Sequence, residues 1–207
     1  MIKMLETKIL KTELDWELVK NCCRSTVKKA FTSGEPSNDF KRTLLIAEHS
    51  PVRELKIVWK WEGIPYWVST EWSRHKFEKY ITSQRNDRQK DYDRNAARQD
   101  APVDFIGSAN LQQLIDSFRK RLCYTATKEA RVLALDFKRE LSKQYPIEAS
   151  NLVPHCVYRG GCSEMLKCGH YQRFLSWWEK NSKGVVDTTD IGARYSAYSD
   201  YVNQDGK

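Results

Sequence analysis

The clearest pattern in the chain is an alternation of side chains from Glu54 to Trp61, where apolar residues occupy every second position. Because successive side chains of a strand point to opposite faces of a sheet, this pattern predicts a strand with one buried face. The Gly63-Ile64-Pro65 sequence that follows predicts a turn. The alternating apolar residues are Leu55, Ile57, Trp59 and Trp61.

Apolar residues recur at helical spacing in four other segments. The longest is predicted from about Ser108 to Gln144, with Ser108 as its N-cap and Pro146 after its end. Its apolar stripe consists of Leu111, Leu114, Ile115, Phe118, Leu122 and Ala126. The three shorter predicted helices are Asp15 to Ala30, Asp39 to Glu48 and Tyr66 to Lys79.

Two remaining segments are polar. Thr82 to Asp100 has no apolar face to bury and predicts a solvated loop, and the Tyr-, Ser- and Asp-rich residues 181–207 predict a poorly ordered tail. We therefore expect one domain over residues 1–180. Its class is α+β, with a small antiparallel sheet flanked by helices that include one long helix.

The 207 residues, 40% of them apolar, suffice for one domain with a real core. No apolar run approaches the roughly 18 residues of a membrane span, and the charged start resembles no secretory signal. The sequence thus predicts a cytoplasmic protein. Its formal net charge of +8 favours anionic partners without choosing among nucleic acid, a membrane surface and small phosphorylated ligands.

The segment with the most candidate chemistry is Glu71 to Arg88, where cationic side chains and His75 surround Ser83 and Gln84. Arginine matches phosphate oxygens two at a time, so a helix end beside this Ser/Gln/Arg loop could hold a phosphate and a flat base together. A solvated basic face explains the same composition. The composition alone leaves both interpretations open.

Two separated segments resemble the signature regions of the flavin-dependent thymidylate synthases. Arg74-His75-Lys76 followed by Ser83-Gln84-Arg85 is similar to the family's Arg-His-Arg and Ser-x-Arg motifs. Lys76 replaces the second arginine, one residue is missing between the two halves, and the family's intervening Ser-x-Asn is absent. Upstream, Glu48-His49-Ser50-Pro51 resembles the family's His-x-Ser-Pro turn before a strand.

The second segment resembles the family's Asn-Ala-Arg helix in one gapless register. The matching residues are Asn110, Leu114, Phe118, Arg121, Cys123, Ala126, Glu129 and Arg131. The resemblance spans roughly residues 20 to 170.

The resemblance implies an enzyme that holds FAD and dUMP together and methylates dUMP to dTMP, with methylenetetrahydrofolate and NADPH as co-substrates. It also implies a homotetramer whose sites lie between subunits. Because reduced flavin supplies hydride in that chemistry, no cysteine nucleophile is needed. The implied flavin contacts are Ser50, Arg74, His75, Lys76 and Asn110. The implied substrate contacts are Glu71, Ser83, Gln84, Arg85 and Arg121, with catalytic roles for Ser83 and Arg121.

Three residues depart from the family within the implied site. Glu71, Gln112 and Asp116 stand where relatives carry a glutamine, an arginine, and an asparagine or histidine. A carboxylate there would repel a phosphate or uracilate unless an opposing arginine paired with it. The segment between the two motifs is also short, and either Arg94 or Arg98 could supply the nucleotide-binding arginine usual in that region.

The chain contains six cysteines, and the absence of a predicted export signal favours thiols or metal ligands over disulfides. Cys156, Cys162 and Cys168 are evenly spaced, and Cys123 could approach them as a fourth thiolate. Four thiolates form a closed tetrahedral zinc site, although the usual spacing of about two to four residues between ligands is absent. A structural zinc ion and buried free thiols are both open alternatives.

The leading hypothesis is a flavin-dependent thymidylate synthase-like enzyme acting on dUMP or a related pyrimidine nucleotide. The alternative is a catalytically inactive or repurposed nucleotide- or nucleic-acid-binding protein on the same scaffold. The basic charge and the altered motif favour the alternative. The joint presence of Arg74, Ser83, Arg85, Asn110 and Arg121 favours the enzyme.

Overall fold

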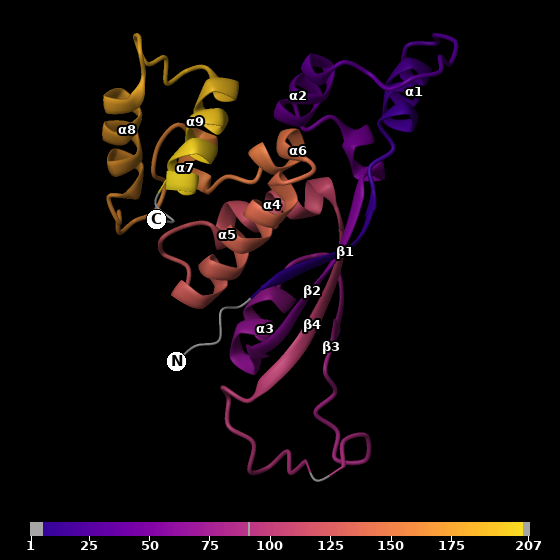
Figure 1. The fold of residues 1–207 in the computed structure, drawn as a ribbon, viewed down its shortest axis with the longest axis vertical. Coiled ribbons are helices and arrows are strands. Elements are labelled where there is room, and N and C mark those ends of the chain that lie inside the picture. Colours follow the sequence, from indigo (N-terminus) through magenta and orange to yellow (C-terminus); the bar gives the residue numbers. More distant parts are fainter. Residues whose placement is uncertain (1–5, 91, 205–207) are drawn as a thin grey trace.

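The structure, a computed structural model, describes residues 6–90 and 92–204. Within these residues, four strands form one antiparallel sheet in the order β1-β2-β4-β3. Helices pack against one face of this sheet (Figure 1). The predicted α+β class with a small antiparallel sheet is therefore confirmed. The strands are β1 (Thr7–Glu13), β2 (Lys56–Pro65), β3 (Glu78–Ile81) and β4 (Pro102–Asn110).

The alternating segment forms strand β2, one of the two inner strands of the sheet, and is a strand as predicted. Ile57, Trp59 and Trp61 are fully buried, and Lys56 is exposed. The strand continues past the predicted turn to Pro65. The register between β2 and β4 shifts between Trp61 and Ile64, and Gly63 has a φ of 64° there. Gly63 therefore bends the strand rather than ending it, because glycine tolerates a positive φ.

The edge strand β1 was not predicted. Its apolar positions are interrupted by charges, and four of its seven residues are exposed. Its partners come from elsewhere in the chain, since it pairs with β2 and the Thr7 backbone N–H donates to Asp136 at 2.6 Å. Asp136 lies on α5 (Lys128–Ser142), so this bond joins the edge of the sheet to a helix distant in sequence.

The first two predicted helices are confirmed with shorter bounds. Helix α1 (Trp16–Thr26) is capped by Asp15, and α2 (Asn38–Ile46) is capped by Ser37. Each capping oxygen accepts a backbone N–H of the first turn, which is a stabilising contact worth about 1 kcal/mol. A short 3₁₀ helix, η1 (Ser50–Glu54), then leads into β2.

The predicted helix from Tyr66 to Lys79 is wrong in its second half. Helix α3 (Tyr66–Ser73) ends before Arg74, and the chain then enters strand β3. The backbone of β3 pairs with β4, a partner more than twenty residues later in the chain. Periodicity within the segment could not reveal that pairing, because the hydrogen bonds of a strand come from its neighbours.

The single long helix predicted from Ser108 to Gln144 is also wrong. Ser108 lies in β4, and the rest forms α4 (Leu111–Arg121), a short turn, and α5. Asn110 caps α4 in a capping box with Gln113, each side chain bonding the other residue's backbone N–H at 2.9 Å. The predicted apolar stripe is nevertheless buried from Leu111 to Leu122.

The expectation of a poorly ordered tail over residues 181–207 is wrong for residues 191–204, which form a helix. The chain forms α6 (Pro146–Ser150), α7 (His155–Arg159), α8 (His170–Asn181) and α9 (Ile191–Gln204). Tyr195, Tyr198 and Val202 of α9 are buried in a second hydrophobic cluster with α7 and α8. Tyrosine rings supply enough apolar area to form this core even though the segment has a polar composition. The proposed boundary at residue 180 stays a prediction.

The polar segment after β3 forms turns without helix or strand across the described residues 82–90 and 92–101, as predicted. None of the helices in residues 6–90 and 92–204 is long and apolar enough to cross a membrane. The cytoplasmic location stays a prediction.

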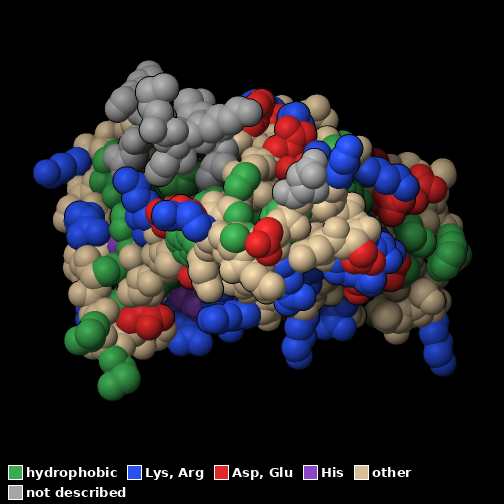
Figure 2. Space-filling view, turned by 90° about the horizontal axis from the view of Figure 1, so that it is seen from below, with side chains coloured by type: hydrophobic (Ala, Val, Ile, Leu, Met, Phe, Trp, Pro, Cys, Tyr) green, Lys and Arg blue, Asp and Glu red, His purple; other side chains and the backbone are tan. Residues whose placement is uncertain are grey.

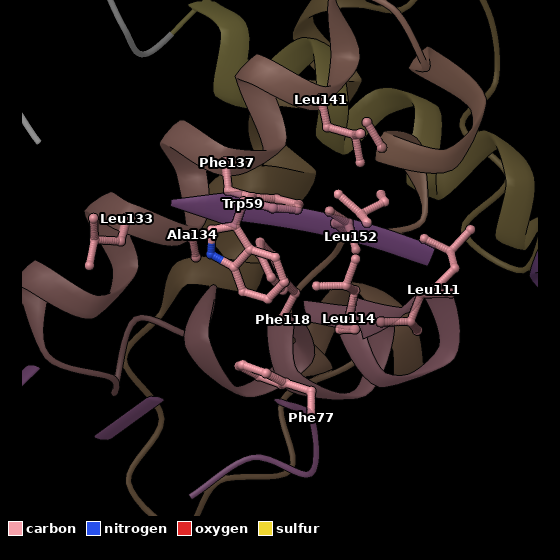
Figure 3. Packing of buried hydrophobic residues seen from close by; sticks show 14 of the residues in the cluster. Trp59, Phe77, Leu111, Leu114, Phe118, Leu133, Ala134, Phe137, Leu141 and Leu152 are labelled. Carbon is pink, nitrogen blue, oxygen red and sulfur yellow. The ribbon is translucent and has the colours of Figure 1, made fainter. Parts of the chain in front are cut away.

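Trp59 lies at the centre of the main core (Figure 3). Its ring centroid is 5.1 Å from that of Phe137 on α5, and 5.3 Å from that of Phe77. Trp59 pairs in register with Gly107 on β4. A Cβ at Gly107 would lie less than 3.0 Å from ring carbons of Trp59. The core therefore requires glycine at this position.

We expect Gly107→Ala to lower the free energy of unfolding by about 1–3 kcal/mol, because the added methyl group overpacks a buried indole. Chemical denaturation of the variant and the wild type measures this loss. Gly184→Ala is the matched control, since no atom lies within 4 Å of a Cβ built there. Equal stabilities for the two variants would contradict the packing described for Trp59.

Candidate functional site

A cavity of about 620 Å³ opens where the end of α3, the start of α4, η1 and α7 come together. Its lining is mainly polar and cationic. It brings together Arg74, His75, Lys76 and Asn110, which are four of the five residues implied for flavin contact. The other lining residues are Arg53, Gln112, Gln113, Asp116, Ser117, Arg119, Lys120 and His155.

The Arg74-His75-Lys76 segment is held between α3 and β3. The His75 backbone N–H donates to Trp72 at 3.1 Å, which closes the last turn of α3, and the side chain of Phe77 is buried just beyond. These two anchors fix the segment while Arg74 and Lys76 stay exposed. Both cations are therefore available to a ligand in the cavity.

The imidazole of His75 is fixed in one protonation state. Burial, and next the Arg121 guanidinium, lower the pKa of His75 to about 4, so the ring is neutral near pH 7. Arg121 Nε donates to His75 Nε2 at 2.8 Å. Because a guanidinium can only donate, the proton of the neutral ring lies on Nδ1. His75 thus retains an Nδ1–H donor for another partner.

Asn110 stands at the N-terminus of α4. Its side chain is used in the capping box, which fixes the first turn of the helix. The backbone N–H groups of Leu111 and Gln113 in this turn already donate to the Leu55 carbonyl and to the Asn110 side chain. The dipole of the helix still favours a negative charge at this end. A phosphate in the cavity would meet this helix end together with the cations of the 74–76 segment.

The Asp116 carboxylate is paired, as expected from its position. It accepts hydrogen bonds from Arg119 at 3.4 Å and from Gln112 at 3.3 Å. Arg119 also forms an ion pair with Glu48, and Gln112 donates to Glu48 at 2.7 Å. The Arg119 guanidinium lies 3.5 Å from the ring centroid of Tyr158 on α7. This network joins α4 to the loop before η1 and to the C-terminal helices.

Glu71 and Arg121 likewise neutralise each other. Arg121 donates to the Glu71 carboxylate at 3.4 Å and to the Glu71 backbone carbonyl, and Thr127 donates to the same carboxylate at 2.8 Å. Within the described chain, neither Glu71 nor Arg121 is among the residues lining the cavity. Their expected substrate contacts, and the catalytic role of Arg121, stay predictions. In this structure Arg121 contacts His75 instead.

The structure does not bring Ser50, Ser83, Gln84 or Arg85 to the lining of this cavity, as far as the described residues show. Ser50 is exposed at the first turn of η1. Arg85 is exposed and forms a two-point ion pair with Asp87, with distances of 2.9 and 2.6 Å. This contact holds the pKa of the Asp87 carboxyl below its usual value. The roles implied for these residues stay predictions.

Arg94 and Arg98 also lie in this loop, away from the cavity lining. Arg98 pairs with Asp100 at 2.9 Å. The choice between these two arginines is therefore still open.

The four cysteines considered as metal ligands lie elsewhere, around a second, much smaller cavity. As their side chains are oriented here, no three Cys, His, Asp or Glu residues of the described ranges are grouped closely enough to hold a metal ion. The metal assignment stays a prediction.

Sequence reasoning missed Arg53, Lys120 and His155 in the cavity, and it missed Glu48 as the partner of Arg119. Arg119 itself is only 7% exposed. An arginine at the edge of an apolar helix stripe was a weak signal for burial. The position of Glu48, before the Ser-Pro turn, gave no signal of a contact with a helix more than sixty residues later.

We expect Glu48→Gln to lower the free energy of unfolding by about 1–3 kcal/mol, because the buried Arg119 guanidinium loses its main counter-charge. Asp100→Asn is the control, since the Arg98–Asp100 pair has side chains that are 83% and 54% exposed. An exposed pair contributes about 0–1 kcal/mol. If denaturation gave equal losses for both variants, Glu48 would not be the residue that stabilises Arg119.

No protein-family model and no curated protein sequence matches this chain. Solved structures do match it. A crystal structure of thymidylate synthase X from Helicobacter pylori, with FAD and dUMP, has a TM-score of 0.59 and 14% sequence identity, and the match covers 72% of this chain and 99% of that chain.

A second Helicobacter pylori structure, of a flavin-dependent thymidylate synthase complexed with FAD and dUMP, gives a TM-score of 0.60 and 13% identity over the same shares. At these sequence identities the structural similarity is evidence for the fold alone. The fold implied by the sequence resemblance is confirmed, and the chain has the fold of the flavin-dependent thymidylate synthases.

Proposed function

We propose that this protein is a flavin-dependent enzyme that converts dUMP, or a related pyrimidine nucleotide, to its methylated product. The observation that carries the proposal is the convergence of Arg74, His75, Lys76 and Asn110 in one cavity. This convergence occurs on a fold shared with structures that hold FAD and dUMP.

The residues present fit an anionic dinucleotide cofactor such as FAD. Among the described residues, the lining contains several cationic side chains and one carboxylate, that of Asp116. This carboxylate is already paired with Arg119. A volume of about 620 Å³ lies within the range of cofactor and ligand sites. The dipole of α4 adds a positive potential at the start of the helix, which favours a phosphate there.

Each residue of this lining has a distinct proposed task. Arg74 and Lys76 would bind the phosphate groups, because both are exposed cations on a fixed segment. The neutral His75 would donate from Nδ1 to a carbonyl or phosphate oxygen of the cofactor, and Arg121 would hold that tautomer. Bound FAD would supply the hydride-transfer chemistry, with NADPH as reductant and methylenetetrahydrofolate as one-carbon donor.

We further propose that the Ser83-Gln84-Arg85 loop serves the cavity of another copy of the chain in a homotetramer. In one chain these residues do not reach the cavity lining, and Arg85 is exposed. A second copy could bring a nucleotide-binding loop beside the cofactor. This arrangement would supply the substrate contacts that the single chain lacks.

The distribution of charge on one face of the molecule gives little support to a nucleic-acid-binding role. On the face shown in Figure 2, Lys and Arg side chains are scattered and interleaved with Asp and Glu. Binding to a nucleic-acid backbone is favoured by a continuous basic surface. The net charge of +8 is compatible with such binding, so this role is the one to test if flavin binding fails.

We expect the purified protein to bind FAD, with flavin absorbance bands that shift when dUMP is added. Arg74→Ala and Lys76→Ala should each weaken FAD binding about tenfold to a hundredfold, because each removes a charge-assisted contact. Lys180→Ala, an exposed cation on α8, is the control. If the wild type did not bind flavin, the assignment as a flavin-dependent enzyme would be wrong. The protein should then be titrated with nucleic acid at several salt concentrations.

The shared-site arrangement predicts complementation between variants. His75→Ala and Arg85→Ala homomers should each form little dTMP, but co-expressed chains should recover about a quarter of wild-type activity if each site takes one residue from each of two subunits. Separate affinity tags on the two chains would allow the mixed oligomers to be isolated. No recovery in purified mixed oligomers would place both residues in a site of one chain.

A further inference from the structure

We propose that Cys123, Cys156, Cys162 and Cys168 bind one zinc ion, which joins α7 and α8 to the end of α4. This inference is independent of the proposed enzymatic function. It concerns residues that the flavin chemistry does not use.

The four thiols come from three separate segments and line the same cavity. Cys123 follows α4, Cys156 lies in the first turn of α7, and Cys162 and Cys168 lie in the connection to α8. Gly160 ends α7 with a φ of 68°, and the Gly161 N–H donates to the Cys156 carbonyl at 2.9 Å. This left-handed turn reverses the chain and returns Cys162 toward Cys156.

The size of the cavity limits what can occupy it. Its volume is about 10 Å³, which is close to the space needed for one water molecule or one ion. An iron–sulfur cluster or an organic cofactor is much larger. The four cysteines among the lining residues are the ligand set of a closed structural zinc site.

Polar atoms without a protein partner are concentrated at this cavity. His155 Nδ1, both ring nitrogens of His170 and the Tyr171 hydroxyl are buried there without a hydrogen bond among the described residues. His170 is only 1% exposed. A buried polar group without a hydrogen-bond partner costs about 1–3 kcal/mol. Several such groups around one cavity therefore favour a polar or ionic occupant there. Zinc-bound thiolates accept hydrogen bonds from such groups, which orient the ligands.

The surrounding charge also suits this ligand set. A zinc ion with four thiolates carries a net charge of about −2, which nearby cations would offset. The guanidinium of Arg131 lies 4.3 Å from the ring centroid of Tyr124, which lines the cavity. Arg173 lies on the same ring at 5.8 Å and donates to the Cys168 carbonyl at 3.1 Å.

Zinc binding requires the thiols to turn inward, because the side chains as oriented here do not form a metal-binding group. Rotation about χ1 moves each sulfur between staggered positions and leaves the backbone in place. Binding would also displace the thiol protons, since the thiolate is the ligand.

The site would have a structural consequence for the larger cavity. His155 precedes Cys156 and lines both cavities. A metal ion on Cys156 would fix the start of α7, and with it His155 and the Tyr158 ring beneath Arg119. The zinc would therefore stabilise one wall of the candidate flavin site.

Elemental analysis of the full-length protein, purified in the presence of zinc, tests the proposal. We expect one zinc per chain, and loss of this zinc in Cys156→Ser and Cys162→Ser. Cys22→Ser and Cys23→Ser are the controls, because these two cysteines lie on α1. Both control variants should still contain one zinc per chain. Zinc content well below one per chain in the wild type, or iron in place of zinc, would overturn the assignment.

A second measurement does not depend on the folding of any variant. In the zinc-loaded wild type, a thiol reagent should modify Cys22 and Cys23, and a strong chelator should then make the other four thiols reactive as zinc is released. Unchanged reactivity after chelation would overturn the proposal. Detection of disulfide bonds among these four cysteines by mass spectrometry would overturn the proposal as well.

Discussion

The side chain of Trp59 fills the space that Gly107 leaves open on the neighbouring strand. This contact fixes the register of β2 against β4, and the remaining strands pair outward from these two. Phe137 of α5 and Phe77 of the segment before β3 pack against the same indole. One buried ring thus couples the centre of the sheet to the helical layer and to the start of the edge strand β3.

The candidate site depends on this core at two points. The 74–76 segment is tethered by the buried Phe77, and α4 begins where β4 leaves the sheet at Asn110. Two cationic residues on the short connection between α3 and β3 therefore meet the N-terminus of α4 at the same cavity. The 74–76 connection is only three residues long between its two anchors, which restricts the positions its side chains can take.

Two arginines of α4 are committed to carboxylates rather than to a ligand. Arg119 pairs with Glu48 and Asp116, and Arg121 pairs with Glu71. The two carboxylates that depart from the family pattern, the half-buried Glu71 and the exposed Asp116, are thus each paired with an arginine, which is the physical condition for tolerating them near an anionic ligand. The same pairing removes Arg121 from the cavity and makes it a positioning partner of His75.

The sequence by itself determined the features that depend on local pattern. It specified the buried face of β2, the starts of α1 and α2, the apolar stripe of α4 and the polar loop after β3. Through motif resemblance, it also identified four residues that the fold gathers at one cavity. Tertiary structure alone decided that β1 and β3 are strands, because the partners that bond their backbones lie far away in the chain.

Tertiary structure also decided where the predicted long helix starts, because residues up to Asn110 pair with β2 as strand β4, and α4 begins only after its capping box. The burial of Arg119 and its contact with Glu48 likewise arise from packing between distant segments. Hydrophobic periodicity reports which face of a segment is apolar. It cannot report which segment covers that face, because this depends on contacts between residues far apart in the chain.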